Sequence, residues 1–425
     1  MDHHMQPDKA NALPEINPEN NKAKPAVQPV LFDTIKADNG YLIGMIQLNA
    51  EKTLNALSLD MIDLMAAQLA TWLTDDNVAM VLMHATGEKA FCAGGDLQHL
   101  YQSMRNHHTS ANKDDIRGNQ YACDFFEREY RLDYMIHTYP KPILCWAHGI
   151  VMGGGMGLMA GASHRVVTEK SRLAMPEINI GLFPDVGGSY FLNQMPDHVG
   201  LFLALTGAMI NASDAKFINL ADYVIVQTDK ARVIALLQQQ PWTNLQTKNG
   251  FLLDAVLCNA QNGLKNDPRS IQQDSTQSGL VQPGPIETQL QTIQALCNHA
   301  NINQVIEAII NHRSEDPWFS KAASTLKKGS PSSAYLASLL LDLAKDMSLA
   351  EVFRMEYLAA LHCAARPDFA EGIRALLIDK DLQPKWHPAT HAEITPEWIN
   401  GYIANPWSLH THPLADLGSH SQQPA

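Results

Sequence analysis

The stretch HGIVMGGGMGLMAGASHRVV, residues 148–167, decides the fold of this chain. Its first apolar residues indicate the end of a buried strand, three glycines follow at 153–155, and HRVV at 164–167 returns to strand composition. A strand that leads through a glycine turn into a helix and then into another strand is typical of α/β proteins. The glycines also let backbone N–H groups approach a ligand, at a helix N-terminus that favours negative charge. The stretch therefore predicts an α/β fold and a site for a ligand that carries or develops negative charge.

The residues before this stretch show the same alternation of strands and helices. VLFDTI at 30–35 and YLIGMIQLN at 41–49 are apolar runs on either side of Asn39-Gly40, a strong hairpin signal. Ser58 is a suitable N-cap for a helix, because the apolar residues from Leu59 to Trp72 recur at helical spacing. The run VAMVLMHAT at 78–86 then predicts a buried strand. We expect an α/β core that extends from residue 30 to about residue 225.

Composition divides the rest of the chain. Residues 1–29 are rich in proline and asparagine and lack the apolar segment of a signal peptide, so we expect a disordered leader. Residues 226–285 are assigned to a variable connection, because the polar stretch from 259 to 285 resembles an exposed linker. Helical spacing predicts a helical region over 286–403, and a disordered tail is expected over 404–425.

Charge and cysteine content restrict the class of protein. The formal net charge of −13 argues against a nucleic-acid partner, whose phosphates require a basic face. No apolar run reaches the roughly 18 residues of a membrane span, so no membrane partner is expected. The six cysteines form no C-x-x-C pair and no zinc-like spacing with histidines. We expect reduced thiols, a cytoplasmic location and no bound metal.

Two further stretches carry chemistry. KAFCAGGDLQHLY at 89–101 contains a second glycine turn, at Gly94 and Gly95, before a predicted helix. AMPEINIGLFPDVGGSYFL at 174–192 sets two acids, Glu177 and Asp185, among apolar and glycine residues. Two turns that each offer a backbone N–H meet the requirements of an oxyanion hole, while a carboxylate is suited to act as a base or nucleophile.

Less specific interpretations of the same residues are open. Glycines also permit close helix packing, and Asp185 could cap the helix that follows it. A dinucleotide-binding turn is a second alternative, since G-x-G-x-x-[G/A] is matched by Gly155, Gly157 and Ala160, and Glu169 ends the next strand. That alternative leaves Gly94, Glu177 and Asp185 without a role.

Taken together, AFCAGGD, MGGGMGL and MPEINIGLFPDVGG resemble the crotonase superfamily of enoyl-CoA hydratases and isomerases. The resemblance implies a spiral of ββα turns followed by a C-terminal helical region. It also implies a coenzyme A thioester as substrate, with the N–H groups of Gly95 and Gly154 as the oxyanion hole. Hydratases of this superfamily use a glutamate at the position of Gly157, so the glycine here argues against hydration.

Within the superfamily, FFEREY at 125–130 and EGIRALLIDKDLQPKW at 371–386 resemble a hydrolase subgroup that acts on short β-hydroxyacyl thioesters of coenzyme A. The resemblance implies that Glu177 and Asp185 are catalytic and that Glu129 contacts the substrate, although EREYRLD alone is typical of a solvated helix face. The predicted contacts to the coenzyme A nucleotide are Asn55, Ala56, Leu57 and Lys89.

The implied reaction is hydrolysis of a 3-hydroxyisobutyryl-CoA-type thioester to free acid and coenzyme A, as in valine degradation. No cofactor is expected, since coenzyme A is part of the substrate. A dienoyl-CoA-type isomerase is an alternative, because that branch uses a glutamate and an aspartate at the same separation. A non-catalytic acyl-CoA-binding protein is another, and homo-oligomerisation is left open.

Overall fold

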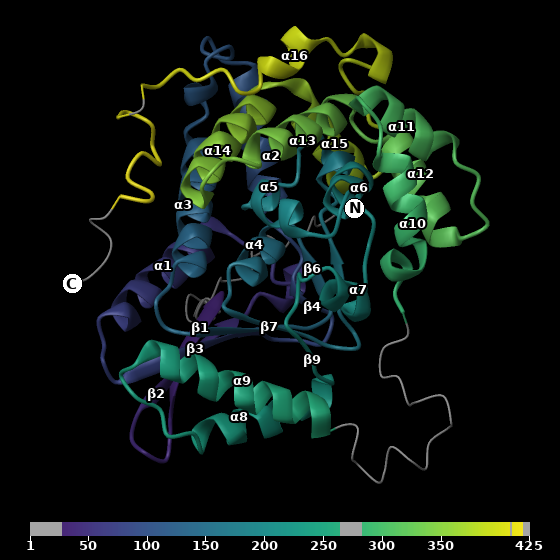
Figure 1. Ribbon diagram of the computed structural model, residues 1–425. Coiled ribbons are helices and arrows are strands. Elements are labelled where there is room, and N and C mark those ends of the chain that lie inside the picture. Colours follow the sequence, from purple (N-terminus) through teal and green to yellow (C-terminus); the bar gives the residue numbers. More distant parts are fainter. Residues whose placement is uncertain (1–27, 264–282, 409, 420–425) are drawn as a thin grey trace, which may run out of the picture.

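The computed structural model describes residues 28–263, 283–408 and 410–419. Its centre is a six-stranded sheet of order β1-β2-β3-β5-β7-β9, in which only the β1–β2 pair is antiparallel, beside a three-stranded parallel sheet of order β4-β6-β8 (Figure 1). The strands are β1 Val30–Lys36, β2 Leu42–Leu48, β3 Val78–Ala85, β4 Ala90–Cys92, β5 Ile143–Ala147, β6 Ile150–Met152, β7 His164–Val167, β8 Arg172–Ala174 and β9 Tyr223–Val224.

The local signals of the N-terminal residues are confirmed. β1 and β2 form the expected hairpin, and Gly40 in its turn has a φ of 95°, which glycine adopts without strain. Helix α1 (Leu59–Leu73) begins where expected, because the Ser58 hydroxyl accepts a hydrogen bond from the Met61 N–H. Five residues of α1, all apolar, are buried against the core, so the predicted apolar face is the observed one.

The chain then winds through three ββα turns, as the resemblance implied. In each turn the first strand, β3, β5 or β7, joins the large sheet, and the second, β4, β6 or β8, joins the small one. The helical parts of the turns are α2 Leu97–His108 with α3 Gln120–His137, then α4 Gly154–Ala160, then η4 Glu177–Ile180 with α5 Gly188–Phe191. The two glycine turns and the acidic stretch therefore occupy equivalent places, each directly after a strand of the small sheet.

Residues 226–263, which composition assigned to the variable connection, form two helices, α8 Lys230–Gln238 and α9 Gln246–Gly263. Both lie under the large sheet in Figure 1, where they build a second hydrophobic core. In β3, Met80 and Leu82 face this second core, while Val81 and Met83 face the main one. Because both faces of the sheet are covered, the strand is buried at every position and apolar at all of them except His84. The polar stretch from 259 onward, on which the assignment depended, says nothing about residues 226–258, so the start of the connection was placed too early.

The C-terminal region is helical, as predicted, and covers the opposite side of the main core (Figure 1). Helices α6 Val199–Thr206 and α7 Ala212–Phe217 lead toward it, and its own helices are α10 Pro285–Cys297, α11 Ile302–Asn311, α12 Pro317–Lys328, α13 Pro331–Ala344, α14 Leu349–Ala365, α15 Pro367–Ile373, the π-helix η8 Arg374–Ile378 and α16 Pro396–Asn400. Among the described residues, no helix has both the length and the apolar character that crossing a membrane requires.

Part of the expected disordered tail is ordered: residues 410–419, called the strap below, pack on the core. Leu414 and Leu417 are buried in the main core, and Arg131 on α3 pairs with Asp416 through two hydrogen bonds of 2.8 and 2.9 Å. The prediction failed because it weighed only polar composition, whereas two leucines and one aspartate hold the segment in place. The leader up to residue 27, the stretch 264–282 and the end from residue 420 lie outside the described residues.

Candidate active site

The sequence motifs meet at one cavity of about 80 Å³. Both glycine turns and all three predicted acids line it, although they come from different turns of the spiral. The lining residues are Ala93, Gly94, Gly95, Leu97, Leu100, Phe125, Phe126, Glu129, Met152, Gly153, Gly154, Pro176, Glu177, Ile180, Leu182, Asp185 and Phe369.

The two glycine turns are held by backbone contacts. Leu57 pairs with Gly95 in a parallel bridge, in which the Leu57 N–H bonds to the Gly94 carbonyl and the Asp96 N–H bonds to the Leu57 carbonyl. Gly154 opens helix α4, so its N–H has no acceptor within that helix. A side chain at Gly154 would displace the Glu129 carboxyl group, because a Cβ there would lie 2.5 Å from Glu129 Oε1. Gly95 and Gly154 both line the cavity, and an oxyanion hole formed by their N–H groups stays a prediction.

Glu177 begins the short helix η4 and is 4% exposed. Its Oε2 atom has no hydrogen-bond partner within the described part of the chain, and its Oε1 atom lies 3.2 Å from where a Cβ on Gly153 would be. Burial, and then the charge of Asp185, raise the pKa of Glu177 well above its ordinary value. A carboxyl group that is buried beside the Gly153 turn, with its Oε2 atom unpaired among the described residues, has the properties of a catalytic base or nucleophile.

Asp185 is held by a hydrogen bond from helix α3. The hydroxyl of Tyr130, on α3, donates a 2.9 Å hydrogen bond to Asp185 Oδ2. Burial raises the pKa of Asp185 to about 7, against the opposing effect of the Tyr130 hydrogen bond. A carboxyl with this pKa can either donate or accept a proton near neutral pH.

Asp185 does not cap the next helix through its side chain, so that alternative is wrong. The N–H groups of Gly187 and Ser189, at the start of α5, bond instead to the two carboxylate oxygens of Glu356, at 2.7 and 2.8 Å. Glu356 is fully buried on α14, and burial raises its pKa to about 8. The sequence motifs assigned no role to Glu356.

Glu129 is 3% exposed, so the interpretation of EREYRLD as a solvated face is wrong at this position. Its carboxyl group lies against Gly154, and burial followed by the charge of Asp185 raises its pKa well above the usual range. Helix α3 thus presents Glu129 to the cavity and Tyr130 to Asp185, while Arg131 points to the strap.

Asp133, one turn further along α3, was missed by sequence reasoning. It is fully buried, and neither carboxylate oxygen finds a hydrogen-bond partner among the residues described. Its Oδ2 atom lies 2.9 Å from where a Cβ on Gly157 would be, so it occupies the space that a side chain at position 157 would need. The i, i+4 spacing of Glu129 and Asp133 could have placed both on one helix face. The site therefore gathers five buried acids: Glu129, Asp133, Glu177, Asp185 and Glu356.

The predicted nucleotide contacts lie outside the lining of this cavity. The Asn55 amide is buried and bonds to main-chain groups of Ala50, Thr86 and Ala90, so its side chain has a structural task. Lys89 is exposed, while Ala56 is partly exposed between buried neighbours. Leu57, which follows Asn55 and Ala56, is bridged to Gly95, so this segment lies next to the Gly95 turn. Contact of Asn55, Ala56, Leu57 and Lys89 with a nucleotide remains a prediction.

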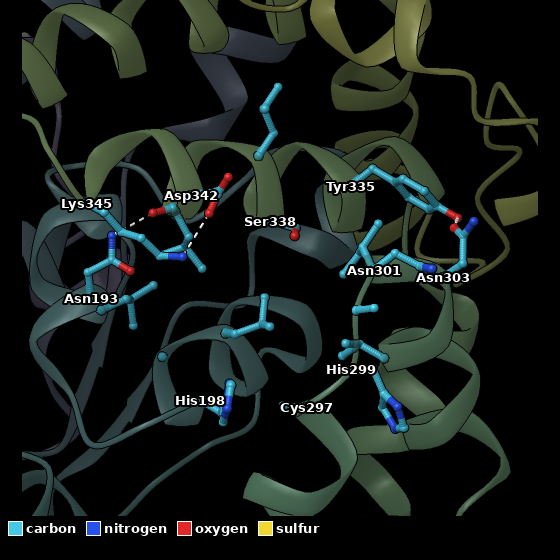
Figure 2. A pocket seen from close by; sticks show the side chains of 18 of the residues that line it. Asn193, His198, Cys297, His299, Asn301, Asn303, Tyr335, Ser338, Asp342 and Lys345 are labelled. Atoms are coloured by element: carbon cyan, nitrogen blue, oxygen red, sulfur yellow. Dashed lines mark hydrogen bonds and ion pairs between the residues drawn. The ribbon is translucent and has the colours of Figure 1, made fainter.

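A larger hollow, of about 790 Å³, lies elsewhere, between α6, α11 and α13 (Figure 2). Asp342 pairs with Lys345 there, and Tyr335 bonds to Asn303. None of the predicted site residues lines it. No group of three or more metal-ligating side chains was found among the described residues.

Comparison with solved structures confirms the expected fold. The chain is similar to an enoyl-CoA hydratase from Rhodobacter sphaeroides 2.4.1, with 28% identity, a TM-score of 0.72, and coverage of 89% of this chain and 98% of that one. It is also similar to a carnitinyl-CoA dehydratase from Mycobacterium thermoresistibile, with 30% identity, a TM-score of 0.72, and coverage of 89% and 97%.

Comparison with curated proteins gives a consistent result. The chain is 36% identical to the mitochondrial 3-hydroxyisobutyryl-CoA hydrolase of Danio rerio over 362 residues, which are 84% of this chain and 86% of the relative. It is 34% identical to the human protein of the same name, with coverage of 85% and 86%. These relatives are mitochondrial by name, so they do not support the cytoplasmic location expected here. The family model for enoyl-CoA hydratase/isomerase matches residues 43–403, and the chain belongs to that family.

Proposed function

We propose that this protein is an acyl-CoA thioester hydrolase that converts a short β-hydroxyacyl-CoA of the 3-hydroxyisobutyryl type to the free acid and coenzyme A. Relatives of that name, 34–36% identical over most of the chain, support hydrolysis. The observation that carries the proposal is the single cavity in which Glu177 and Asp185 face the turns of Gly95 and Gly154. Breakdown of a thioester needs these two elements, a carboxyl group and an oxyanion hole, at one carbonyl.

In the proposed reaction, the thioester carbonyl oxygen accepts hydrogen bonds from the N–H groups of Gly95 and Gly154. Glu177 either removes a proton from a water whose oxygen bonds to the carbonyl carbon, or bonds to that carbon itself. The carbon–sulfur bond then breaks, and the coenzyme A sulfur leaves and takes up a proton. If Glu177 is the nucleophile, water then hydrolyses the resulting anhydride and regenerates the carboxyl group.

The second and third acids are assigned to the acyl group. Asp185, held by Tyr130, and Glu129, on the same helix as Tyr130, face the cavity from its α3 side. A β-hydroxyl group can donate to one carboxyl and accept from another when one of them is protonated, as the raised pKa values of both favour. This arrangement predicts faster release of coenzyme A from β-hydroxyacyl thioesters than from acetyl-CoA.

One assay tests the proposal. The purified protein is incubated separately with 3-hydroxyisobutyryl-CoA, 3-hydroxypropionyl-CoA, acetyl-CoA and a dienoyl-CoA, while free thiol and diene absorbance are followed. Thiol release that is fastest with the two hydroxyacyl substrates supports hydrolysis. Loss of diene absorbance without thiol would indicate the isomerase, and binding without either signal would indicate a non-catalytic protein.

Glu177→Gln is the matching variant, because it keeps the size of the side chain but removes its charge and nearly all its basicity. Turnover should fall by about 10²-fold or more, whereas the affinity for coenzyme A should be almost unchanged. Glu127→Gln, on the partly exposed side of α3, is the control. Hydrolysis by Glu177→Gln at a rate close to wild type, with an unchanged melting temperature, would refute the assigned role.

A further inference from the structure

One residue of the C-terminal region reaches the cavity. Of the lining residues, all but Phe369 come from the segment between Ala93 and Asp185. Phe369 lies on α15, is fully buried, and has no role in the proposed chemistry. An aromatic ring that is brought to a site from a distant part of the chain contributes shape, since it has no group that could transfer a proton.

Helix α15 is fixed directly against the segment that carries Glu177. A Cβ on Gly181 would lie 2.5 Å from the main-chain carbonyl of Asp368, and a Cβ on Gly372 would lie 2.4 Å from the Cα of Ile180. The two backbones therefore touch at two points, before and after Phe369. Such contact leaves the ring little freedom to move away from Ile180 and Leu182.

The start of α15 is also fixed by hydrogen bonds to the carboxylate of Asp368. Asp368 is buried, and its two carboxylate oxygens accept hydrogen bonds of 2.7 Å from the Ser330 hydroxyl and from the His387 N–H. These bonds tie the residue before Phe369 to the start of α13 and to the segment after η8. Phe369 is therefore part of a rigid wall, and the cavity cannot easily widen when a longer acyl group enters.

The volume of the cavity is small, although residues from several helices and turns line it. A cavity needs roughly 10–15 Å³ to hold one water molecule, so a volume of about 80 Å³ has room for a few waters or for a short acyl group. Helix α15 packs on both α2 and η4, so Phe369 lies in the apolar part of the wall together with Leu97, Leu100, Phe125, Phe126, Met152, Ile180 and Leu182. Phe125 and Phe126 belong to α3, so Phe369 is the aromatic ring that the C-terminal region supplies to this wall.

We infer that Phe369 is a specificity-determining residue that limits the length of the acyl group, so that the C-terminal region selects the substrate of a site whose chemistry lies in the α/β core. This inference rests on the proposed thioesterase activity. It predicts that a smaller side chain at position 369 enlarges the cavity and leaves the catalytic groups in place, because Glu177, Asp185 and both glycine turns belong to other segments.

The experiment compares kcat/KM for 3-hydroxyisobutyryl-CoA, 3-hydroxyhexanoyl-CoA and 3-hydroxyoctanoyl-CoA in wild type, Phe369→Leu and Phe369→Ala. One methylene group in an apolar pocket changes kcat/KM by roughly 10- to 200-fold. We therefore expect the preference for the shortest substrate over 3-hydroxyhexanoyl-CoA to fall by about 10-fold or more in Phe369→Ala, and by less in Phe369→Leu. Phe369→Leu serves if the alanine variant does not fold.

Phe319→Ala is the matched control. Phe319 is also a fully buried phenylalanine of the C-terminal region, on α12, but it packs on Phe202 and does not line the cavity. It should lower the melting temperature and leave the chain-length preference as in wild type. Unchanged preference in both Phe369 variants, with wild-type hydrolysis intact, would overturn the inference. Absence of hydrolysis in wild type would instead overturn the proposed function.

Discussion

The hydroxyl group of Tyr130 donates a 2.9 Å hydrogen bond to Asp185 Oδ2, although 55 residues separate the two in the chain. Tyr130 is fully buried, and the bond is the one side-chain contact on the described residues that opposes the effect of burial on the pKa of Asp185. The phenol therefore keeps Asp185 able to ionise near neutral pH.

The variant Tyr130→Phe removes this bond and leaves the ring in place. Because the hydrogen bond favours ionised Asp185, its loss should raise the pKa of Asp185 above about 7. If turnover needs the ionised form, the acidic limb of the kcat profile should move to higher pH, and kcat at pH 7 should fall roughly 10-fold. Tyr139→Phe is the control, since that hydroxyl donates to the Leu69 carbonyl in the core. Superimposable profiles for wild type and Tyr130→Phe would exclude the coupling.

Glu356→Gln tests the remote cap of α5. The carboxylate accepts from both Gly187 and Ser189, whereas an amide offers one oxygen and must turn its NH₂ group toward the other N–H. A buried N–H without an acceptor costs about 1–3 kcal/mol, so the free energy of unfolding should fall by about that amount in urea titrations. Turnover should also fall, because the same turn carries Asp185. Glu351→Gln, at the exposed cap of α14, is the comparison and should cost less.

The buried acids predict how stability depends on pH. Glu129, Asp133, Glu177, Asp185 and Glu356 all have pKa values raised by burial, to about 7 for Asp185 and about 8 for Glu356. The folded protein therefore holds protons that the unfolded chain releases near pH 4, and the stability this provides is lost as pH rises through the folded pKa values. Urea midpoints should fall between pH 5.5 and pH 8.5.

Asp185→Asn should flatten this fall, because it removes one group that titrates in the range. Glu127→Gln should leave the slope as it is, since that side chain is partly exposed and paired with Arg131. A midpoint that rises steadily from pH 5.5 to pH 8.5 would show that these acids are ionised in the folded state.

Gly157→Ala tests whether Asp133 fills the space at position 157. Alanine normally favours a helix over glycine by about 1 kcal/mol, but here its Cβ would lie 2.7 Å from Val186 Cβ and 2.9 Å from Asp133 Oδ2. We expect a net loss of about 1–3 kcal/mol in the free energy of unfolding, as for other overpacked cores. Gly250→Ala, in α9, where no atom lies within 4 Å of the new Cβ, should stabilise the protein instead. Equal effects of the two substitutions would contradict the crowding at Gly157.

Local chemistry made much of this fold predictable. The hairpin at Asn39-Gly40 and the cap at Ser58 depend on neighbouring residues, and each is where the sequence placed it, whereas the spiral of ββα turns was implied by the family resemblance. Helices α8 and α9 were missed because the polar stretch from 259 onward, on which the assignment depended, says nothing about residues 226–258. The ordered strap was missed because a few buried leucines outweigh a polar composition.

Some residues of the candidate site were also predictable from the sequence, and others were not. Motifs and resemblance selected Gly95, Gly154, Glu177, Asp185 and Glu129, and all five line one cavity, although their roles remain predictions. Glu356 could not be assigned a role from sequence, because its partners lie 169 and 167 residues away and no local pattern records the contact. Phe369 was missed for the same reason, since only packing brings α15 to η4.

The remote cap also bears on how the protein emerges from the ribosome. Gly187 leaves the exit tunnel 169 residues before Glu356, an interval of roughly 10–30 s at translation rates of about 5–20 residues per second. During that interval the turn that presents Asp185 has no carboxylate to accept its N–H groups. The turn that carries Asp185 can therefore form its hydrogen bonds to Glu356 only after α14 has been synthesised. In a stalled or truncated chain without α14, that turn would stay exposed to chaperones and proteases.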